Sequence, residues 1–127
     1  MSDCCAASDV LVFGCSGGSN VGQIANDAAK ALHTLGQGRM YCLVGVGAQL
    51  PSFVAAAKKA KKCVAIDGCE IACARKALEK AGITPHVYVV VTDLGIKKEH
   101  NFTYTIEDVG KVAKAVVEAI SYKTDSA

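Results

Sequence analysis

The chain has 127 residues, 51% of them hydrophobic, so it can bury the core of one domain and is too short for two. Its 14 Lys and Arg residues against 12 Asp and Glu residues give a net charge of +2, which offers no surplus of positive charge to nucleic acid or to an acidic membrane surface. No segment approaches the roughly 18 to 20 uncharged apolar residues of a membrane helix.

Short runs rich in β-branched residues alternate with longer amphipathic segments, the pattern of a parallel sheet with crossover helices. Strands are predicted at 10–13, 40–44, 63–66 and 87–91, and helices at 21–35, 52–60, 69–81 and 105–121. We expect capping boxes at the starts of the first and last helices, from Asn20 with Gln23 and from Thr105 with Asp108. Pro51 falls in the first turn of the second helix.

These elements predict an α/β fold: a single-domain three-layer sandwich with a four-stranded parallel sheet in the Rossmann-like or flavodoxin-like order 2-1-3-4. The domain is expected to span residues 9–122. A flexible cysteine-containing arm at 1–8 precedes it, and a frayed tail at 123–127 follows it.

Seven cysteines are an odd number, at a lower density than in small secreted proteins held together by disulfides. The first residues lack the basic stretch and apolar run of a signal peptide. We therefore expect a cytoplasmic protein, in which cysteines are metal ligands, reactive thiols or core residues rather than structural disulfides.

The cysteines gather where such a sheet binds ligands, at the carboxyl ends of its strands. Cys15 follows the first strand and Cys69 follows the third, and the predicted order makes these strands neighbours. Cys73 is four residues after Cys69, on the same face of the predicted helix. Cys42, near the end of the second strand, joins them if its side chain points that way, and packs in the sheet if it does not. Cys63, at the opposite end of the third strand, is expected to pack in the core.

Two kinds of chemistry fit these thiols. Four thiolates suit a tetrahedral Zn²⁺ site, but two of the thiols could equally form a reversible disulfide. Cys69 at a helix start and Cys15 in a glycine-rich turn both meet partial positive charge, which predicts a lowered pKa for each thiol. A lowered pKa assists a metal ligand and a nucleophile alike.

Further residues could complete a metal site. Cys4 and Cys5 on the N-terminal arm, and His100 in the loop after the fourth strand, are possible additional ligands. Asp67 either orients a ligand from the second shell or caps the following helix.

The glycine-rich turn also resembles an anion-binding loop, because it leads into a helix N-terminus. Its candidate residues are Gly17, Gly18, Ser19 and Asn20. The Lys of a P-loop and the Arg of a phosphatase loop are both missing from this turn, so we do not expect a nucleotide. We find no complete catalytic signature and do not expect an enzyme.

Three segments together resemble one family: Ile66-Asp67-Gly68-Cys69 with Cys73, the turn from Cys15 to Gln23, and residues 40–48. They are similar to the motifs of the DGC-domain family of proposed zinc-binding proteins, which is named for its central Asp-Gly-Cys. The resemblance covers nearly the whole chain. It implies a small prokaryotic cytoplasmic protein whose four motif cysteines hold the metal, here Cys15, Cys42, Cys69 and Cys73, and it brings no catalytic activity.

We therefore predict a cytoplasmic protein that binds a metal ion, Zn²⁺, through thiolates at the carboxyl edge of the sheet. One alternative is a thiol redox protein, or one that handles persulfide or selenium, which uses Cys69 and Cys73 with Cys15 and meets another thiol or redox protein. Another is a partner-binding module without chemistry. The sequence does not define the oligomeric state.

Overall fold

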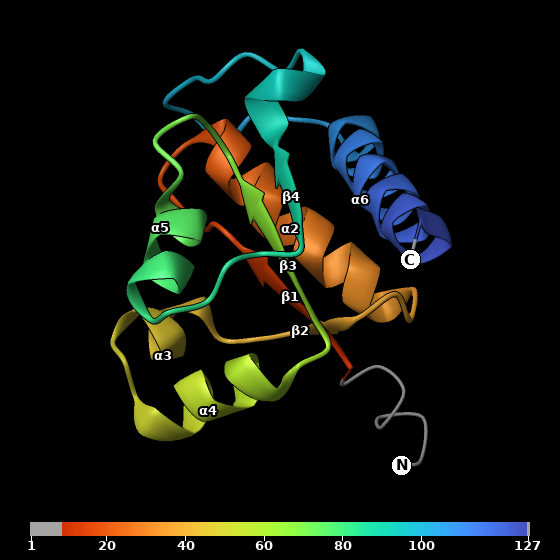
Figure 1. Ribbon diagram of the computed structural model, residues 1–127. Helices are drawn as coiled ribbons and strands as arrows, with labels where there is room; N and C mark the ends of the chain where they lie inside the picture. Colours follow the sequence, from red (N-terminus) through yellow and green to blue (C-terminus); the bar gives the residue numbers. More distant parts are fainter. Residues whose placement is uncertain (1–8, 127) are drawn as a thin grey trace.

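A computed structural model describes residues 9–126, with side chains as far as Tyr122 (Figure 1). Within this range four parallel strands form one sheet: β1 (Val10–Gly14), β2 (Arg39–Met40), β3 (Lys62–Asp67) and β4 (Val87–Val90). The order β2-β1-β3-β4 confirms the predicted topology. β1 pairs with β3 along its whole length, from Val10 opposite Lys62 to Gly14 opposite Ile66, so the carboxyl ends of these two strands lie side by side.

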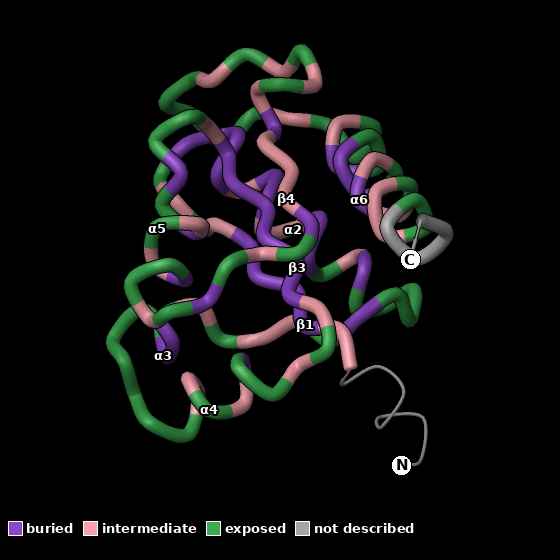
Figure 2. The backbone as a smooth tube through the Cα atoms, in the orientation of Figure 1, coloured by how far each residue is buried: buried purple, intermediate pink, exposed green. Residues whose placement is uncertain are grey.

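Helices cover both faces of the sheet, as expected for a three-layer sandwich. On one face, α2 (Asn20–Thr34) and α6 (Ile106–Ser126) pack over strand residues such as Val12. On the other, α3 (Leu43–Gly47), α4 (Pro51–Lys59) and α5 (Cys73–Lys80) cover Leu11 and Phe13. Residues 11 to 13 alternate between the faces because successive side chains of a strand point to opposite sides. Figure 2 shows the buried backbone concentrated along β1 and β3.

The second strand is shorter than predicted. β2 ends at Met40, and a short helix, α3, begins at Leu43 within the segment predicted as strand 40–44. The ladder with β1 continues only to a hydrogen bond of 2.9 Å from the Tyr41 amide to the Val12 carbonyl. Beyond it the chain buries Val46 through a helical turn. Tertiary packing thus overrides the strand propensity of this apolar segment.

Helix starts were predicted with mixed success. The box at the last helix is confirmed: the Asp108 amide donates to the Thr105 hydroxyl at 3.1 Å, and the Thr105 amide donates to the Asp108 carboxylate at 3.2 Å. Pro51 is the first residue of α4, as expected. The capping box predicted at the first helix was placed one residue too late, because the N-cap is Ser19 and Asn20 is already part of α2.

The last strand leads into a short 3₁₀ turn, η1 (Val91–Leu94), and a loop that returns over the carboxyl edge toward α2 before α6 begins. α6 extends to Ser126, beyond the predicted end near residue 121. Across the part of the chain that is described, no helix combines the length and the apolar character needed to cross a membrane.

Candidate functional site

A cavity of about 190 Å³ opens at the carboxyl ends of β1 and β3, where the sequence placed the site. The loops after these two strands form most of its wall, and the first turns of α2 and α5 and the loop after η1 complete it. We call it the thiol pocket. Its polar and sulfur-bearing lining residues are Cys15, Ser19, Asp67, Cys69, Cys73, Lys98 and His100.

Glycines allow the walls of the thiol pocket to approach one another. A Cβ on Gly68 would lie 2.8 Å from the Gly22 amide nitrogen and 2.8 Å from the Val21 carbonyl carbon. A Cβ on Gly22 would in turn lie 2.7 Å from the carbonyl oxygen of Gly17. The turns after β1 and β3 therefore pack backbone against backbone on the first turn of α2, which only glycine permits at these positions.

Asp67 acts as the cap of α5. One carboxylate oxygen accepts the Ala74 amide at 2.8 Å, and the other accepts the Arg75 amide at 3.0 Å and the Tyr88 hydroxyl at 2.8 Å. These donors stabilise a carboxylate whose residue is only 1% exposed. Of the two roles considered for Asp67, these contacts assign the capping role.

The predicted helix from residue 69 was wrong at its start. α5 begins at Cys73, and Cys69 lies in a turn closed by a bond of 3.1 Å from the Ala72 amide to the Cys69 carbonyl. Ala72 has a left-handed backbone, with φ of 61°, which breaks any helix through this segment. Because Asp67 reaches over the turn to cap the helix at Cys73, Cys69 and Cys73 are not an i, i+4 pair on one helix. Both nevertheless line the thiol pocket.

Cys15 is half-buried, and its environment differs from the prediction. Burial raises the pKa of the Cys15 thiol, and this effect outweighs the hydrogen bonds from the Gly17 and Gly68 backbones, which lower it. The negative charge of Asp67 and of Cys73 raises it further. The predicted lowering of this pKa is therefore wrong, because desolvation of the thiolate exceeds the stabilisation by backbone amides.

Lys98 is a pocket residue that the sequence analysis missed. Its Nζ lies 3.5 Å from the Cys69 sulfur. The loop that carries it is held to α2 by Asn20, whose side chain donates to the Lys97 carbonyl at 2.8 Å and accepts the Glu99 amide at 2.6 Å. His100, which the sequence suggested as a possible additional ligand, lines the pocket from the same loop. The sequence did contain a signal for Lys98: it lies in the same loop as His100, and this loop follows the last strand at the edge of the sheet where the pocket was predicted.

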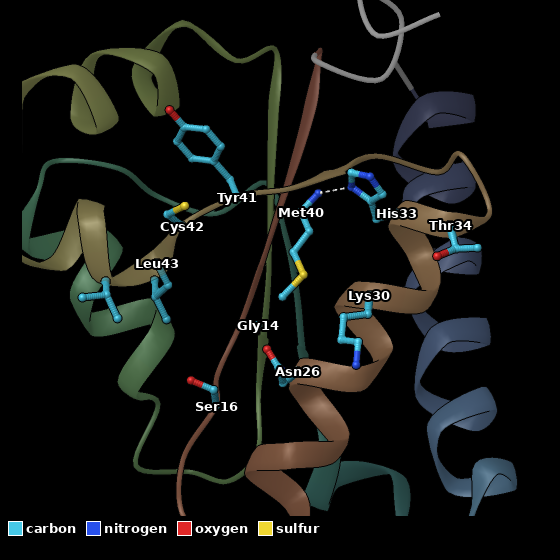
Figure 3. A pocket seen from close by; sticks show the side chains of 11 residues that line it. Gly14, Ser16, Asn26, Lys30, His33, Thr34, Met40, Tyr41, Cys42 and Leu43 are labelled. Atoms are coloured by element: carbon cyan, nitrogen blue, oxygen red, sulfur yellow. Dashed lines mark hydrogen bonds between the residues drawn. The ribbon is translucent and has the colours of Figure 1, made fainter.

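Cys42 lies elsewhere. It precedes α3 as its N-cap residue, is exposed, and lines a second cavity with Gly14 and Ser16 (Figure 3). The structure therefore does not bring it to the pocket of Cys15, Cys69 and Cys73. The reason is the early end of β2 at Met40, after which the chain leaves the sheet and begins α3 at Leu43.

The remaining candidates have structural roles or are not described. Cys63 is 1% exposed and its sulfur donates to the Ala57 carbonyl at 3.4 Å, so it packs in the core as predicted; burial raises its pKa. In the anion-loop candidate, the Ser19 hydroxyl accepts the Gly22 amide at 3.1 Å, and Asn20 holds the opposite loop. Cys4 and Cys5 lie outside the described residues.

Within residues 9–126, no group of three or more His, Cys, Asp and Glu side chains is arranged to hold a metal ion. The thiol pocket supplies sulfur and imidazole, the ligand types that Zn²⁺ prefers. The donor chemistry thus fits zinc.

Comparison with known proteins identifies the family. The model of the DGC domain matches residues 11–116, most of the chain and all of the sheet except the first residue of β1. The chain belongs to the DGC-domain family. It is also 32% identical over 102 residues to the anaerobic and virulence modulator AnvM of Pseudomonas aeruginosa, a match that covers 80% of this chain and 78% of AnvM. No solved structure matches the chain significantly.

In this DGC-domain protein, the three residues of the central motif perform three separate tasks. Asp67 caps α5, Gly68 permits the close approach to α2, and Cys69 carries a thiol into the pocket. The motif therefore builds the pocket as well as contributing to its lining.

Proposed function

We propose that this DGC-domain protein binds Zn²⁺ through the thiolates of Cys15, Cys69 and Cys73 in the thiol pocket. The supporting observation is that these cysteines, which come from the ends of two neighbouring strands and the start of α5, line one cavity with His100. Three thiolates and an imidazole form a ligand set that tetrahedral zinc accepts. Ligation by Cys69 requires Lys98 to release the sulfur.

The metal would have a structural or carrier role rather than a catalytic one in this proposal, since four protein ligands leave no open position. The thiols must stay reduced, which suits the cytoplasm. The name of AnvM describes a modulator, and a regulatory role in which metal occupancy controls contact with a partner is compatible with such a site.

The proposal is tested by metal analysis of protein purified under anaerobic, reducing conditions, followed by titration of the metal-free protein with Zn²⁺ against a chromophoric chelator. We expect one equivalent of zinc, and a loss of affinity of at least about tenfold in Cys69→Ser and Cys73→Ser. Cys42→Ser is the matched control, because Cys42 is exposed and lines a different cavity. Wild-type affinity in Cys69→Ser and Cys73→Ser would refute the proposal.

One contact favours a second candidate, thiol redox chemistry. The ammonium of Lys98 beside the Cys69 sulfur is suited to stabilise a thiolate nucleophile. Two pocket thiols would then give two electrons and two protons to one glutathione disulfide, forming a protein disulfide and two glutathione thiols. Incubation of metal-free protein with glutathione disulfide, followed by mass spectrometry, would detect a reversible disulfide among these cysteines if this candidate is correct.

A further inference from the structure

A second cavity lies beside the thiol pocket and has no part in the proposed metal binding. It has a volume of about 590 Å³ and lies between α2 and α3, beyond the ends of β1 and β2 (Figure 3). The loop after β1 separates the two cavities: Gly14 and Ser16 line this one, and Cys15 and Gly17 line the thiol pocket. We call it the β2 groove. Its volume is in the range of roughly 300 to 1,000 Å³ that small-molecule sites occupy.

One part of the β2 groove is apolar. Met40, Leu43 and Val44 line it, and Figure 3 shows Met40 extending into the space between Leu43 of α3 and Lys30 of α2. Val44 is 79% exposed, so its branched apolar side chain is accessible to a ligand in the groove. Met adapts its shape and makes favourable contacts with aromatic rings, so this wall suits an apolar or aromatic body.

The opposite part, on α2, carries hydrogen-bond donors and a positive charge. The His33 Nδ1 atom accepts the Met40 amide at 3.0 Å, so Nε2 carries the ring hydrogen and acts as a donor. Lys30 is 64% exposed and lies 3.6 Å from Asp27, whose carboxylate also accepts the Tyr104 hydroxyl. An exposed pair of this kind is weak, so the ammonium can contact a ligand.

No carboxylate is among the described residues that line the β2 groove. A cation and a fixed donor at one side, with an apolar wall at the other, are complementary to an amphipathic anion. We propose that the β2 groove binds a small organic anion. Its apolar body, aromatic in the preferred case, packs on Met40, Leu43 and Val44, and its carboxylate or sulfonate meets Lys30 and His33.

The proposal is tested with two fluorescent probes that share one aromatic body. Anilinonaphthalene sulfonate carries an anionic group, and phenylnaphthylamine does not. We expect the sulfonate to bind with a stoichiometry of one. Lys30→Met should weaken its binding about tenfold, the equivalent of one charge-assisted hydrogen bond, and should leave the neutral probe unaffected. Lys114→Met, which removes an exposed lysine of α6 outside the groove, is the control for net charge.

Lys30 also borders a cavity between α2 and α6 that includes Ile106, so the site itself must be located. Val44→Asp and Ile106→Asp are a matched pair, because these apolar side chains are 79% and 81% exposed and line different cavities. Val44→Asp should abolish binding of the sulfonate, whereas Ile106→Asp should reduce it little. The reverse result would overturn the proposal.

Cys42 provides a direct report from the β2 groove, since its exposed thiol lines it. The sulfonate probe should slow alkylation of Cys42 by iodoacetamide severalfold, as measured by peptide mass spectrometry, and leave alkylation of Cys73 in the thiol pocket unchanged. Absence of protection, or equal loss of both probes in Lys30→Met, would overturn the proposal. Both readouts are taken on metal-free protein, in which zinc does not protect Cys73, so this site and the metal site can fail independently.

Discussion

The hydroxyl of Tyr88 on β4 donates a hydrogen bond of 2.8 Å to the carboxylate of Asp67 at the end of β3. The same carboxylate accepts two amides of the first turn of α5, from Ala74 and Arg75. A phenol on one strand and a helix N-terminus thus share one buried anion. Since α5 begins at Cys73, this network also fixes the position of a pocket thiol.

Replacing Tyr88 by phenylalanine tests the network. Tyr88→Phe removes one of three donors to Asp67 and keeps the ring, over which the Arg75 guanidinium lies at 4.9 Å. We expect the free energy of unfolding in urea to fall by about 1 kcal/mol, the net value of one hydrogen bond. Tyr41→Phe is the control, because it keeps the ring contacts with Phe13 and Phe53. An equal loss in both variants would contradict the assigned role.

The same contact predicts a dependence of stability on alkaline pH. Burial first, and then the hydrogen bond to Asp67, raise the pKa of Tyr88 above its ordinary value. Because the folded state retains a proton that the unfolded state releases, stability is fully present below the unfolded pKa of about 10 and is lost as pH rises above it. Urea unfolding at a series of alkaline pH values should show a shallower decline in Tyr88→Phe than in the wild type. Parallel curves would contradict this.

Gly68 is predicted to tolerate no side chain. Its Cβ would lie 2.8 Å from two backbone atoms of α2, which cannot move aside as a flexible side chain would. Gly68→Ala should lower the free energy of unfolding by about 1 to 3 kcal/mol. Gly18→Ala is the matched control in the neighbouring turn, because a Cβ there meets nothing within 4 Å, and should change stability by less than about 0.5 kcal/mol. Thermal or urea unfolding compares the two directly.

The sheet order and the meeting of Cys15 with Cys69 could be predicted because alternating strands and helices indicate a doubly wound parallel sheet, for which 2-1-3-4 is a common strand order. Parallel strands bring their carboxyl ends to one edge whatever the details of the loops. Cys63 was likewise assigned correctly to the core from its place at the opposite end of β3.

The position of Cys42 could not be predicted, because it depends on whether residues 41–44 continue an edge strand or begin a helix. Packing of Val46 and of the Tyr41 ring decides this, and periodicity in a five-residue run does not. The start of α5 was predicted wrongly for a similar reason. A carboxylate six residues before Cys73 caps the helix across a turn, a distance that the local capping rules do not cover.

Lys98 was missed because its position depends on a tether between distant segments. The side chain of Asn20, 6% exposed at the start of α2, bonds the backbone on both sides of Lys98. A residue expected from sequence to cap its own helix instead fixes a loop nearly 80 positions away. Such a contact leaves no periodic signal.

Removal of this tether should loosen the loop specifically. Asn20→Ala deletes two side-chain hydrogen bonds, to the Lys97 carbonyl and from the Glu99 amide, and should cost about 2 kcal/mol of stability. Amide hydrogen exchange should accelerate across residues 95–101 and remain slow in β1 and β3, because the sheet core is untouched. Asn101→Ala is the control within the same loop, since it removes exposed hydrogen bonds with Glu99 and Thr103. If exchange accelerates as much in Asn101→Ala as in Asn20→Ala, Asn20 does not hold the loop over the thiol pocket.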